Sequence, residues 1–321
     1  MQYYHSKKPI SIQNTAVACG KFDGIHLGHQ ALLNKLFEYE AKGLAPTVFT
    51  FDSSISKMMN HDGFIYTGEE RRYILSKMGI AYLAEYAFDE AMASMSAKQF
   101  IEEILVQQLG AKAIVVGEDF HFGYEREGNV DVLKHYAARY GYELSVVSKQ
   151  QDNEGRISSS RIRDALCEGN MEKAFAMLGR PYFIKGEVIH GRKLGRTIGM
   201  PTANVAVPEG KLVPPRGVYV SRNILRGQTY YGITNIGMKP TVKGEEMGVE
   251  TFLFDFDADI YGAEMIVEFL HFKRPEQCFE NVAELTKQMK KDAEYGRKMA
   301  ADYKKDFTTM DIYDKIHKYD F

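Results

Sequence analysis

The segment at residues 20–30 constrains the fold of this chain more than any other. It reads Gly-Lys-Phe-Asp-Gly-Ile-His-Leu-Gly-His-Gln and follows the apolar run at residues 16–19. An amphipathic run, with apolar residues on one helical face at residues 32–37, comes after it. The pattern predicts a strand that turns directly into a helix, with His26 and His29 at the turn.

The N-terminus of such a helix suits a phosphate. Its first backbone N–H groups have no partner within the helix, and the positive end of the helix dipole lies there. Imidazoles at His26 and His29 also place donors on oxygens that gain charge as a phosphoryl bond breaks. The simpler alternative is a turn with two structural histidines, one of them in the core. The position directly after a strand argues against it.

The residues around the two histidines fit a close approach to a ligand. Gly20, Gly24 and Gly28 permit a tight turn and bring the backbone near the bound group. We expect Phe22 to pack, and Asp23 either to orient a histidine or to fix the turn. The segment therefore predicts the handling of nucleotide phosphates.

The first half of the chain alternates strand-like and helix-like segments. This alternation predicts an α/β domain with a parallel, doubly wound sheet and helices on both faces. Ligands of such sheets bind outside the carboxyl ends of the strands, where the histidine segment would lie. The expected strands are at residues 15–19, 46–51, 114–116 and 144–147, and the expected helices at 27–41, 69–78, 97–109 and 130–140.

The second half changes character after residues 179–181. Short β-rich segments punctuated by Gly and Pro predict a small antiparallel, Greek-key-like β-barrel, closed by a C-terminal helix at residues 281–305. We therefore expect an α/β domain at residues 1–180 and a β domain at residues 181–321. The expected strands of the second domain are at residues 183–189, 217–224, 230–235, 250–256 and 265–272.

Composition narrows the class of protein. A length of 321 residues favours two domains, and a formal net charge of −2 argues against a general nucleic-acid binder. Three distant cysteines indicate neither a disulfide framework nor a zinc site. The sequence contains neither a signal-peptide core nor an apolar run that approaches a membrane span. We expect a cytoplasmic protein without a membrane or obligate protein partner.

A second motif, Val-Gly-Glu-Asp-Phe-His-Phe-Gly at residues 116–123, follows an expected strand. It again places glycines and an acidic residue at the carboxyl end of that strand. Asp119 there would either bind a ribose hydroxyl or a metal, or simply form a turn. We expect Phe120 and Phe122 to belong to the core.

A third motif, Arg-Ile-Ser-Ser-Ser-Arg-Ile-Arg, occupies residues 156–163. Serines ahead of a helix cap it. Hydroxyls with an arginine three residues later, as in Ser160 and Arg163, also form an anion site that suits a leaving pyrophosphate. Taken alone, the motif indicates only a helix cap with solvated arginines.

Together, these three motifs resemble the nucleotidylyltransferase superfamily, and more closely the FMN adenylyltransferase module of prokaryotic FAD synthetases. The resemblance implies a Rossmann-like domain in which the FMN phosphate attacks the α-phosphorus of ATP and pyrophosphate leaves. His26 and His29 would stabilise ATP phosphates, and Arg163 would hold the β- and γ-phosphates with Ser160. The implied nucleotide-binding set is Gly20, Phe22, Asp23, Gly24, Gly28, Asp119 and Ser160.

One segment departs from this family. Residues 53–56 read Ser-Ser-Ile-Ser where the family usually carries a Pro-His-Pro-like segment near the flavin. The Ser53-Ser54 departure leaves open an adenylyltransferase that is impaired or differently regulated.

The strongest signal in the second half is the glycine-rich, basic run at residues 186–204. Gly191, Gly195 and Gly199 recur at steps of four, with Arg192 and other cations between them, which suits phosphates. The run lacks the ending of a P-loop, and a surface hairpin is the alternative.

Hard oxygen donors and an acidic residue accompany this run. Thr202 and Asn204 offer oxygens for Mg2+. Glu250 begins an apolar strand, where it would act as a general base for a hydroxyl nucleophile or simply face solvent.

This half resembles riboflavin kinase, in its Gly-Arg-x-x-Gly-x-x-x-Gly-x-Pro-Thr-Ala-Asn run and in residues 232–237 and 274–279. The resemblance implies that Thr202 and Asn204 bind Mg2+ and ATP phosphates, and that Glu250 takes the proton from the ribityl hydroxyl. The implied nucleotide-binding residues are Gly191, Arg192, Gly195 and Gly199.

We therefore expect a bifunctional enzyme that phosphorylates riboflavin to FMN and adenylylates FMN to FAD, with ATP as co-substrate. Two alternatives remain: a homologue in which only the kinase works, and a non-catalytic protein that senses flavin or nucleotide. The joint presence of His26, His29, Thr202 and Glu250 argues against the second alternative.

Overall fold

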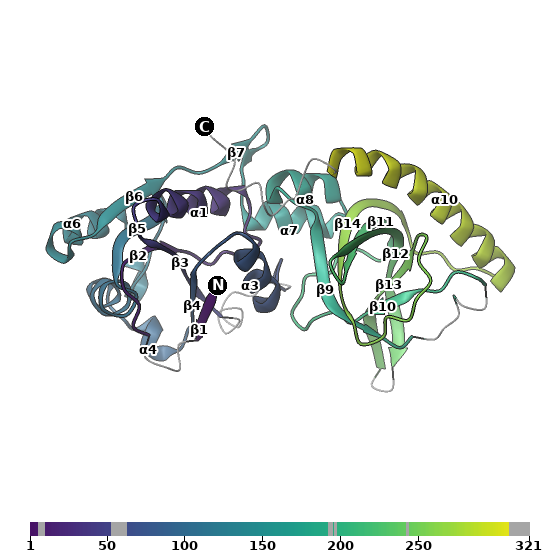
Figure 1. Ribbon diagram of the computed structural model, residues 1–321, viewed down its shortest axis with the longest axis horizontal. Helices are drawn as coiled ribbons and strands as arrows, with labels where there is room; N and C mark the ends of the chain where they lie inside the picture. Colours follow the sequence, from purple (N-terminus) through teal and green to yellow (C-terminus); the bar gives the residue numbers. More distant parts are fainter. Residues whose placement is uncertain (6–9, 53–62, 192–194, 196–197, 242–243, 308–321) are drawn as a thin grey trace. The chain divides into compact units, whose positions relative to one another are not determined.

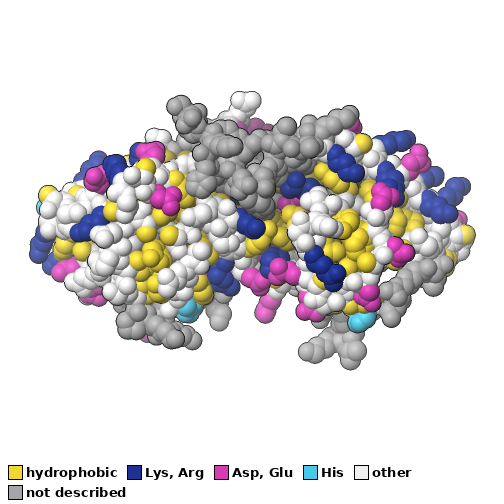
Figure 2. All heavy atoms as spheres, viewed as in Figure 1, with side chains coloured by type: hydrophobic (Ala, Val, Ile, Leu, Met, Phe, Trp, Pro, Cys, Tyr) yellow, Lys and Arg dark blue, Asp and Glu magenta, His cyan; other side chains and the backbone are white. Residues whose placement is uncertain are grey.

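The computed structural model describes the chain except residues 6–9, 53–62, 192–194, 196–197, 242–243 and 308–321 (Figure 1). Met1–Ser159 form one compact unit, and residues 160–307 form a second. The domain boundary expected at residue 180 stays a prediction. Among the described residues, no helix has the length and apolarity needed to cross a membrane. Basic and acidic side chains are interspersed on the face shown in Figure 2.

The first unit is built on a six-stranded sheet in the order β1-β4-β3-β2-β5-β6, with every pair parallel. The predicted doubly wound α/β architecture is therefore confirmed, together with all four expected strands. The edge strand β1 and the strand β4 were not predicted. The strands are β1 (Gln2–His5), β2 (Thr15–Cys19), β3 (Ala45–Phe51), β4 (Tyr82–Tyr86), β5 (Ala111–Gly117) and β6 (Glu143–Val147).

The helices of this unit lie close to their predicted positions. The segment expected as one helix at residues 97–109 is a short α-helix that continues as a π-helix, η2. The elements are α1 (Leu27–Glu40), α3 (Gly68–Lys77), α4 (Glu90–Ala93), α5 (Ala97–Gln99), η2 (Phe100–Gln108), η3 (Tyr124–Arg126) and α6 (Val130–Tyr140), with the hairpin β7 (Gln151–Asp152) and β8 (Gly155–Arg156).

The order of the strands creates a point where the chain changes direction. From β2 the chain proceeds to β3 and β4 on one side, and then crosses to β5 on the other side of β2. Loops that leave β2 and β5 at their carboxyl ends therefore diverge, and such a point is the usual ligand site of doubly wound sheets. The first and second sequence motifs follow these two strands.

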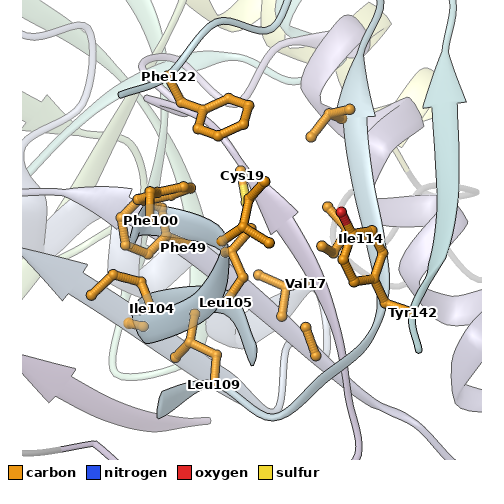
Figure 3. Close-up of a cluster of buried hydrophobic side chains, with 14 of the residues drawn as sticks. Val17, Cys19, Phe49, Phe100, Ile104, Leu105, Leu109, Ile114, Phe122 and Tyr142 are labelled. Atoms are coloured by element: carbon orange, nitrogen blue, oxygen red, sulfur yellow. The ribbon is translucent and has the colours of Figure 1, made fainter. Parts of the chain in front are cut away.

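A buried apolar cluster supports this part of the sheet (Figure 3). Val17 on β2 and Ile114 on β5 are fully buried within it, next to Leu105 of η2. Phe122 also belongs to the cluster, and Phe120 packs against it, as predicted for both. The strands that carry the two motifs thus rest on one continuous core.

The second unit is a closed antiparallel barrel in the order β10-β13-β12-β11-β14-β9, which confirms the predicted barrel. The short strand β10 was not predicted, and the strand expected at residues 250–256 begins earlier and ends at Leu253. The strands are β9 (Tyr182–Ile189), β10 (Ala203–Val205), β11 (Gly217–Leu225), β12 (Gln228–Thr241), β13 (Gly244–Leu253) and β14 (Glu264–Pro275).

In the part of the chain that the structure describes, the barrel is accompanied by helices α7 (Ser159–Cys167), α8 (Met171–Leu178) and α10 (Val282–Phe307), the predicted C-terminal helix. Helix α8 packs on β9 and β14, and Glu172 accepts a hydrogen bond from the His271 ring at 2.6 Å. Helix α10 lies along the barrel and contacts β11 and β12 (Figure 1).

Replacing Ile114 with Ala should destabilise the first unit by about 3 kcal/mol, because the change leaves a cavity in a close-packed core. Val146→Ala on the neighbouring strand β6 is the matched control, since its side chain is 41% exposed; we expect a change below about 0.5 kcal/mol. Native-state hydrogen exchange of the β2 and β5 amides measures the free energy of unfolding of both variants. Equal effects of the two substitutions would contradict the assignment of the core.

Candidate functional site

The two histidines meet at the start of α1. His26 is the N-cap residue, with an extended backbone, and its Nδ1 accepts a hydrogen bond from the backbone N–H of His29 at 3.4 Å. The two rings are stacked with their centroids 3.8 Å apart. The predicted strand-turn-helix is confirmed, and it holds two imidazoles at a helix N-terminus, beyond the carboxyl end of β2.

The turn that precedes them has an unusual backbone. Phe22 and Ile25 have φ values of +50° and +42°, although neither is glycine, and both side chains are fully buried. Such conformations cost about 1–3 kcal/mol each and persist only where the surroundings hold them. The ring of Phe22 lies 5.1 Å from that of His29, so Phe22 packs as predicted.

Glycines and Asp23 keep this turn in place. A Cβ atom at Gly28 would lie 3.1 Å from the His26 ring, and one at Gly20 would lie 3.2 Å from the Phe22 ring. The Asp23 carboxylate accepts a hydrogen bond from the backbone N–H of Ile65 at 3.1 Å. Asp23 therefore fixes the turn, which is one of the two roles predicted for it, and Gly24 adopts the left-handed φ of +83°.

Asp119 follows β5 and is held by two cations. Arg156 donates to its Oδ2 at 2.5 Å, and the Lys149 ammonium lies 3.2 Å from the same oxygen. Burial by itself raises the pKa of Asp119, but the hydrogen bonds from Arg156 and Lys149 outweigh it and lower the pKa. Asp119 is therefore an ionised carboxylate, and a ribose hydroxyl or a metal there would share it with these cations.

The third motif lies on α7. Ser160 and Arg163 are one turn apart in this helix, and contacts group both residues with the second unit. The preceding residue, Ser159, donates its hydroxyl hydrogen to the backbone carbonyl of Asp23 at 2.9 Å. The roles of Ser160 and Arg163 at a nucleotide stay predictions.

The second unit contains a cavity of about 590 Å3 between the barrel and α10. Its walls are largely apolar, with Met200, Phe252 and Leu285 among them. The predicted residues Gly195, Thr202 and Glu250 also line it.

The register of the barrel strands sets polar groups side by side at this cavity. Asn204 on β10 lies opposite Glu250 on β13, and Glu250 lies opposite Asn235 on β12. Directly opposed residues project from the same face of a sheet, with Cβ atoms about 5 Å apart. The structure therefore brings together Asn204 and Glu250, which the sequence places 46 residues apart, and adds Asn235, which was not predicted as a site residue.

The predicted glycines of the second unit fit this arrangement. A Cβ atom at Gly191 would lie 2.4 Å from the amide nitrogen of Asn204, and one at Gly195 would lie 2.3 Å from the carbonyl oxygen of Met200. Gly199 has a left-handed φ of +71°. Arg192 lies outside the described residues, as do Ser53 and Ser54.

Sequence reasoning missed an ionic cluster at the cavity wall. Asp292 of α10 accepts hydrogen bonds from Lys273, from Arg274 at 2.6 Å and from Gln288 at 2.9 Å. Burial by itself raises the pKa of Asp292, but the hydrogen bonds from Arg274, Lys273 and Gln288 outweigh it and lower the pKa. The only signal in the sequence is an aspartate among the lysines of a long polar helix, which normally indicates a solvated face.

Comparisons with known proteins agree with this two-part organisation. A family model of FAD synthetase matches residues 8–161, and one of riboflavin kinase matches residues 178–300. The bifunctional riboflavin kinase/FMN adenylyltransferase of Bacillus subtilis is 38% identical over 287 residues, which cover 87% of this chain and 90% of the relative. The protein of that name from Escherichia coli K12 is 35% identical over 294 residues, which cover 90% and 93%.

A solved structure is also similar over almost its whole length. It is a Streptococcus pneumoniae protein named a macrolide-efflux protein, with a TM-score of 0.82 and 33% sequence identity. The similarity covers 92% of this chain and 99% of that protein.

Asp292→Asn should destabilise the second unit by about 3 kcal/mol at neutral pH, because Lys273 and Arg274, each 15% exposed, lose their counter-charge. The folded state lowers the pKa of Asp292 below its ordinary value of 3.8, so this stabilisation is fully present above pH 3.8 and is lost as pH falls through the folded pKa. The difference between wild type and variant should therefore shrink only below pH 3.8.

Urea denaturation of the full chain, followed at the barrel amides, measures this difference. Glu294→Gln, an exposed member of an ion pair on the same helix, is the control and should change stability little. A difference that persists unchanged well below pH 3.8 would contradict the ionic role of Asp292.

Proposed function

Since the chain belongs to the family of bifunctional riboflavin kinases/FMN adenylyltransferases and makes FMN and FAD with ATP, we propose a division of the two reactions between its halves. Residues 1–180 adenylylate FMN, and residues 181–321 phosphorylate riboflavin. The observation that carries the proposal is that each unit has its own group of polar residues suited to phosphate chemistry. In the first unit these are the stacked histidines, and in the second they are the aligned residues Asn204, Glu250 and Asn235.

In the first reaction, an FMN phosphate oxygen attacks the α-phosphorus of ATP. The bond from that phosphorus to the bridging oxygen of the β-phosphate breaks, and pyrophosphate leaves. His26 and His29 donate to the phosphate oxygens as they gain charge, together with the N–H groups that begin α1. The stacked rings, 3.8 Å apart, support this assignment because they meet where the helix dipole favours an anion.

Other residues of this site have binding roles in the proposal. Ser160 and Arg163 hold the β- and γ-phosphates, and Asp119 binds on the nucleotide or metal side. The backbone of the turn cradles the nucleotide at Gly20, Phe22, Asp23, Gly24 and Gly28.

In the second reaction, Glu250 takes the proton from the ribityl hydroxyl of riboflavin, and that oxygen attacks the γ-phosphorus of ATP. The bond from that phosphorus to the bridging oxygen of the β-phosphate breaks, and ADP leaves. Apolar walls around the cavity suit the flavin ring, and 590 Å3 lies within the usual range of small-molecule sites. Glu250 lines the same cavity, so a flavin bound there would present its ribityl chain to the Glu250 carboxylate. The glycine-rich run with Gly191, Arg192, Gly195 and Gly199 holds the ATP phosphates.

Mg2+ fits the residues beside Glu250. The side chain of Asn204 is 4% exposed, and Gly191 leaves space against it that a Cβ atom would fill. Thr202 and Asn204 supply neutral oxygens, and Mg2+ typically combines few protein ligands with substrate phosphates and water. Bound there, the ion would neutralise phosphate charge.

We further propose the cytoplasm as the compartment of this enzyme, where ATP is abundant and thiols stay reduced. Cys19, Cys167 and Cys278, all within the described residues, form no disulfide, which suits that setting. Its partners in the proposal are the small molecules riboflavin, FMN and ATP alone, without nucleic acid, membrane or an obligate protein.

His29→Ala should lower FAD formation by roughly 100-fold or more, because it removes a donor to charge that develops in the transition state. FMN formation from riboflavin should be unchanged. Incubation with riboflavin, ATP and Mg2+, followed by separation of the flavins, measures both products. His135→Ala, an exposed histidine on α6, should leave both unchanged; loss of FMN formation in His29→Ala would contradict separate sites.

Glu250→Gln should lower FMN formation by roughly 100-fold or more, since it removes the general base but keeps the shape of the side chain. Adenylylation of supplied FMN should continue at the wild-type rate. Asn204→Ala should likewise lower FMN formation and leave adenylylation of supplied FMN unchanged. The FMN formation that remains should require more Mg2+ for its half-maximal rate. Glu187→Gln, an exposed strand residue of the same barrel, is the control. Wild-type kinase activity in Glu250→Gln would refute the assignment.

A further inference from the structure

A buried ion pair lies in the first unit, outside the residues assigned so far. Arg71 of α3 is 6% exposed, Glu85 of β4 is 1% exposed, and Nη2 of Arg71 pairs with Oε1 of Glu85. Burying such a pair costs free energy of desolvation and often stabilises a fold no better than apolar residues of the same size. A specific geometric role would account for its presence.

The guanidinium also reaches two backbone carbonyls. Nη1 of Arg71 donates to the carbonyl of Lys21 at 3.1 Å, and Nη2 donates to that of Phe51 at 2.8 Å. Lys21 begins the turn after β2, and Phe51 ends β3. Thr50 donates to the Lys21 carbonyl as well, at 3.1 Å.

These carbonyls lie where the two strands part. The ladder between β2 and β3 ends at the pair Cys19 and Phe49, and the next hydrogen bond, from Gly20 N–H to the Phe49 carbonyl, is 3.2 Å long. Beyond it the Lys21 carbonyl accepts hydrogen bonds from Arg71 and Thr50. A planar guanidinium with several donors can serve the Lys21 and Phe51 carbonyls at once. The next residue, Phe22, enters its left-handed conformation directly afterwards.

We propose that Arg71, oriented by Glu85, is a positioning residue for FMN adenylylation, which holds the turn so that His26 and His29 face the phosphates. The proposal rests on the assignment of these histidines to the adenylylation site. Arg71 touches neither substrate in this scheme and acts through the backbone of the turn.

The surroundings make Arg71 rigid. Thr67 and Glu70 form a capping box, with hydrogen bonds of 2.9 and 3.3 Å, that fixes the first turn of α3. Glu70 directly precedes Arg71 in this turn. The second oxygen of Glu85 accepts hydrogen bonds from Tyr3 at 2.7 Å and from Arg72 at 2.9 Å. Glu85 is thus held from three sides.

Arg72 provides a matched control. It is the neighbour of Arg71, carries the same charge and binds the same carboxylate, but it is 33% exposed. It contacts Glu85 and the ring of Tyr3, whose centroid is 4.9 Å from the guanidinium carbon. Any effect that arises only from the charge balance of Glu85 should therefore appear in both arginines.

The test compares Arg71→Lys and Arg72→Lys in the full chain. Lysine keeps the charge but has no planar fork to bridge two carbonyls and a carboxylate. We expect Arg71→Lys to lower kcat for FAD formation from FMN, ATP and Mg2+ by roughly tenfold or more, a barrier increase of about 1.4 kcal/mol or more. Riboflavin kinase activity should stay at the wild-type level, and Arg72→Lys should stay within about twofold for both reactions.

A spectroscopic measurement separates positioning from a general loss of stability. The imidazole C–H NMR signals of His26 and His29 should shift in Arg71→Lys at a temperature where the protein is fully folded, while those of His121 and His135 stay unchanged. Should Arg71→Lys fail to fold, Glu85→Gln, which keeps an acceptor but removes the charge, takes its place with the same expected changes.

Wild-type kcat for FAD formation in the folded variant, or an equal loss in Arg72→Lys, would overturn the proposal. Unshifted His26 and His29 signals would do so as well. His29→Ala is run in parallel. If it keeps full FAD formation, the site assignment is wrong; if it is inactive while Arg71→Lys is fully active, only the positioning role is wrong.

Discussion

Strand β2 pairs in parallel with β3 on one side and with β5 on the other, and this double pairing determines where the first unit can hold a nucleotide. Because the strands are parallel, their carboxyl ends meet at one edge of the sheet, and the chain leaves β2 and β5 in different directions. The histidine turn and Asp119 both occupy that edge. The fully buried strand Thr15–Cys19 anchors the turn to the core, so a strained backbone at Phe22 and Ile25 can persist.

The second unit also brings polar side chains together, but it does so through strand register and not through a turn. These side chains project from one face of neighbouring antiparallel strands of the barrel, so their alignment depends on how the strands pair. A slip of one residue would turn Glu250 to the opposite face of β13. Buried hydroxyls inside the barrel oppose such a slip, because Thr234 and Thr251, from the same strands as Asn235 and Glu250, share a hydrogen bond of 2.8 Å.

Local patterns were sufficient to predict the strand-turn-helix at His26, the parallel sheet, the barrel and the C-terminal helix. Strand β4 was not predicted because Glu85 interrupts an otherwise apolar run. The burial of Glu85 depends on Arg71, a partner 14 residues away. Asp292 was missed for the same reason, because a charged residue on a polar helix is expected to face solvent unless its partner is known. The alignment of Asn204, Glu250 and Asn235 is a property of strand register, which a single sequence does not reveal. The structure also extends η2 with π-type hydrogen bonding, for which the sequence carries no distinct signal.

A shared electrostatic pattern connects these elements. Asp119, Glu85 and Asp292 each bind two cations: Lys149 and Arg156, Arg71 and Arg72, and Lys273 and Arg274. Each carboxylate orients its cations, and each cluster keeps a surplus of one positive charge. At Asp119 and Asp292, a chain with a formal net charge of −2 can in this way place positive groups beside the sites proposed for phosphates or flavin. The cluster at Glu85 instead supports the backbone of the histidine turn. The carboxylates thus act as rigid supports for cations, and this explains why acidic residues recur beside sites proposed to bind anions.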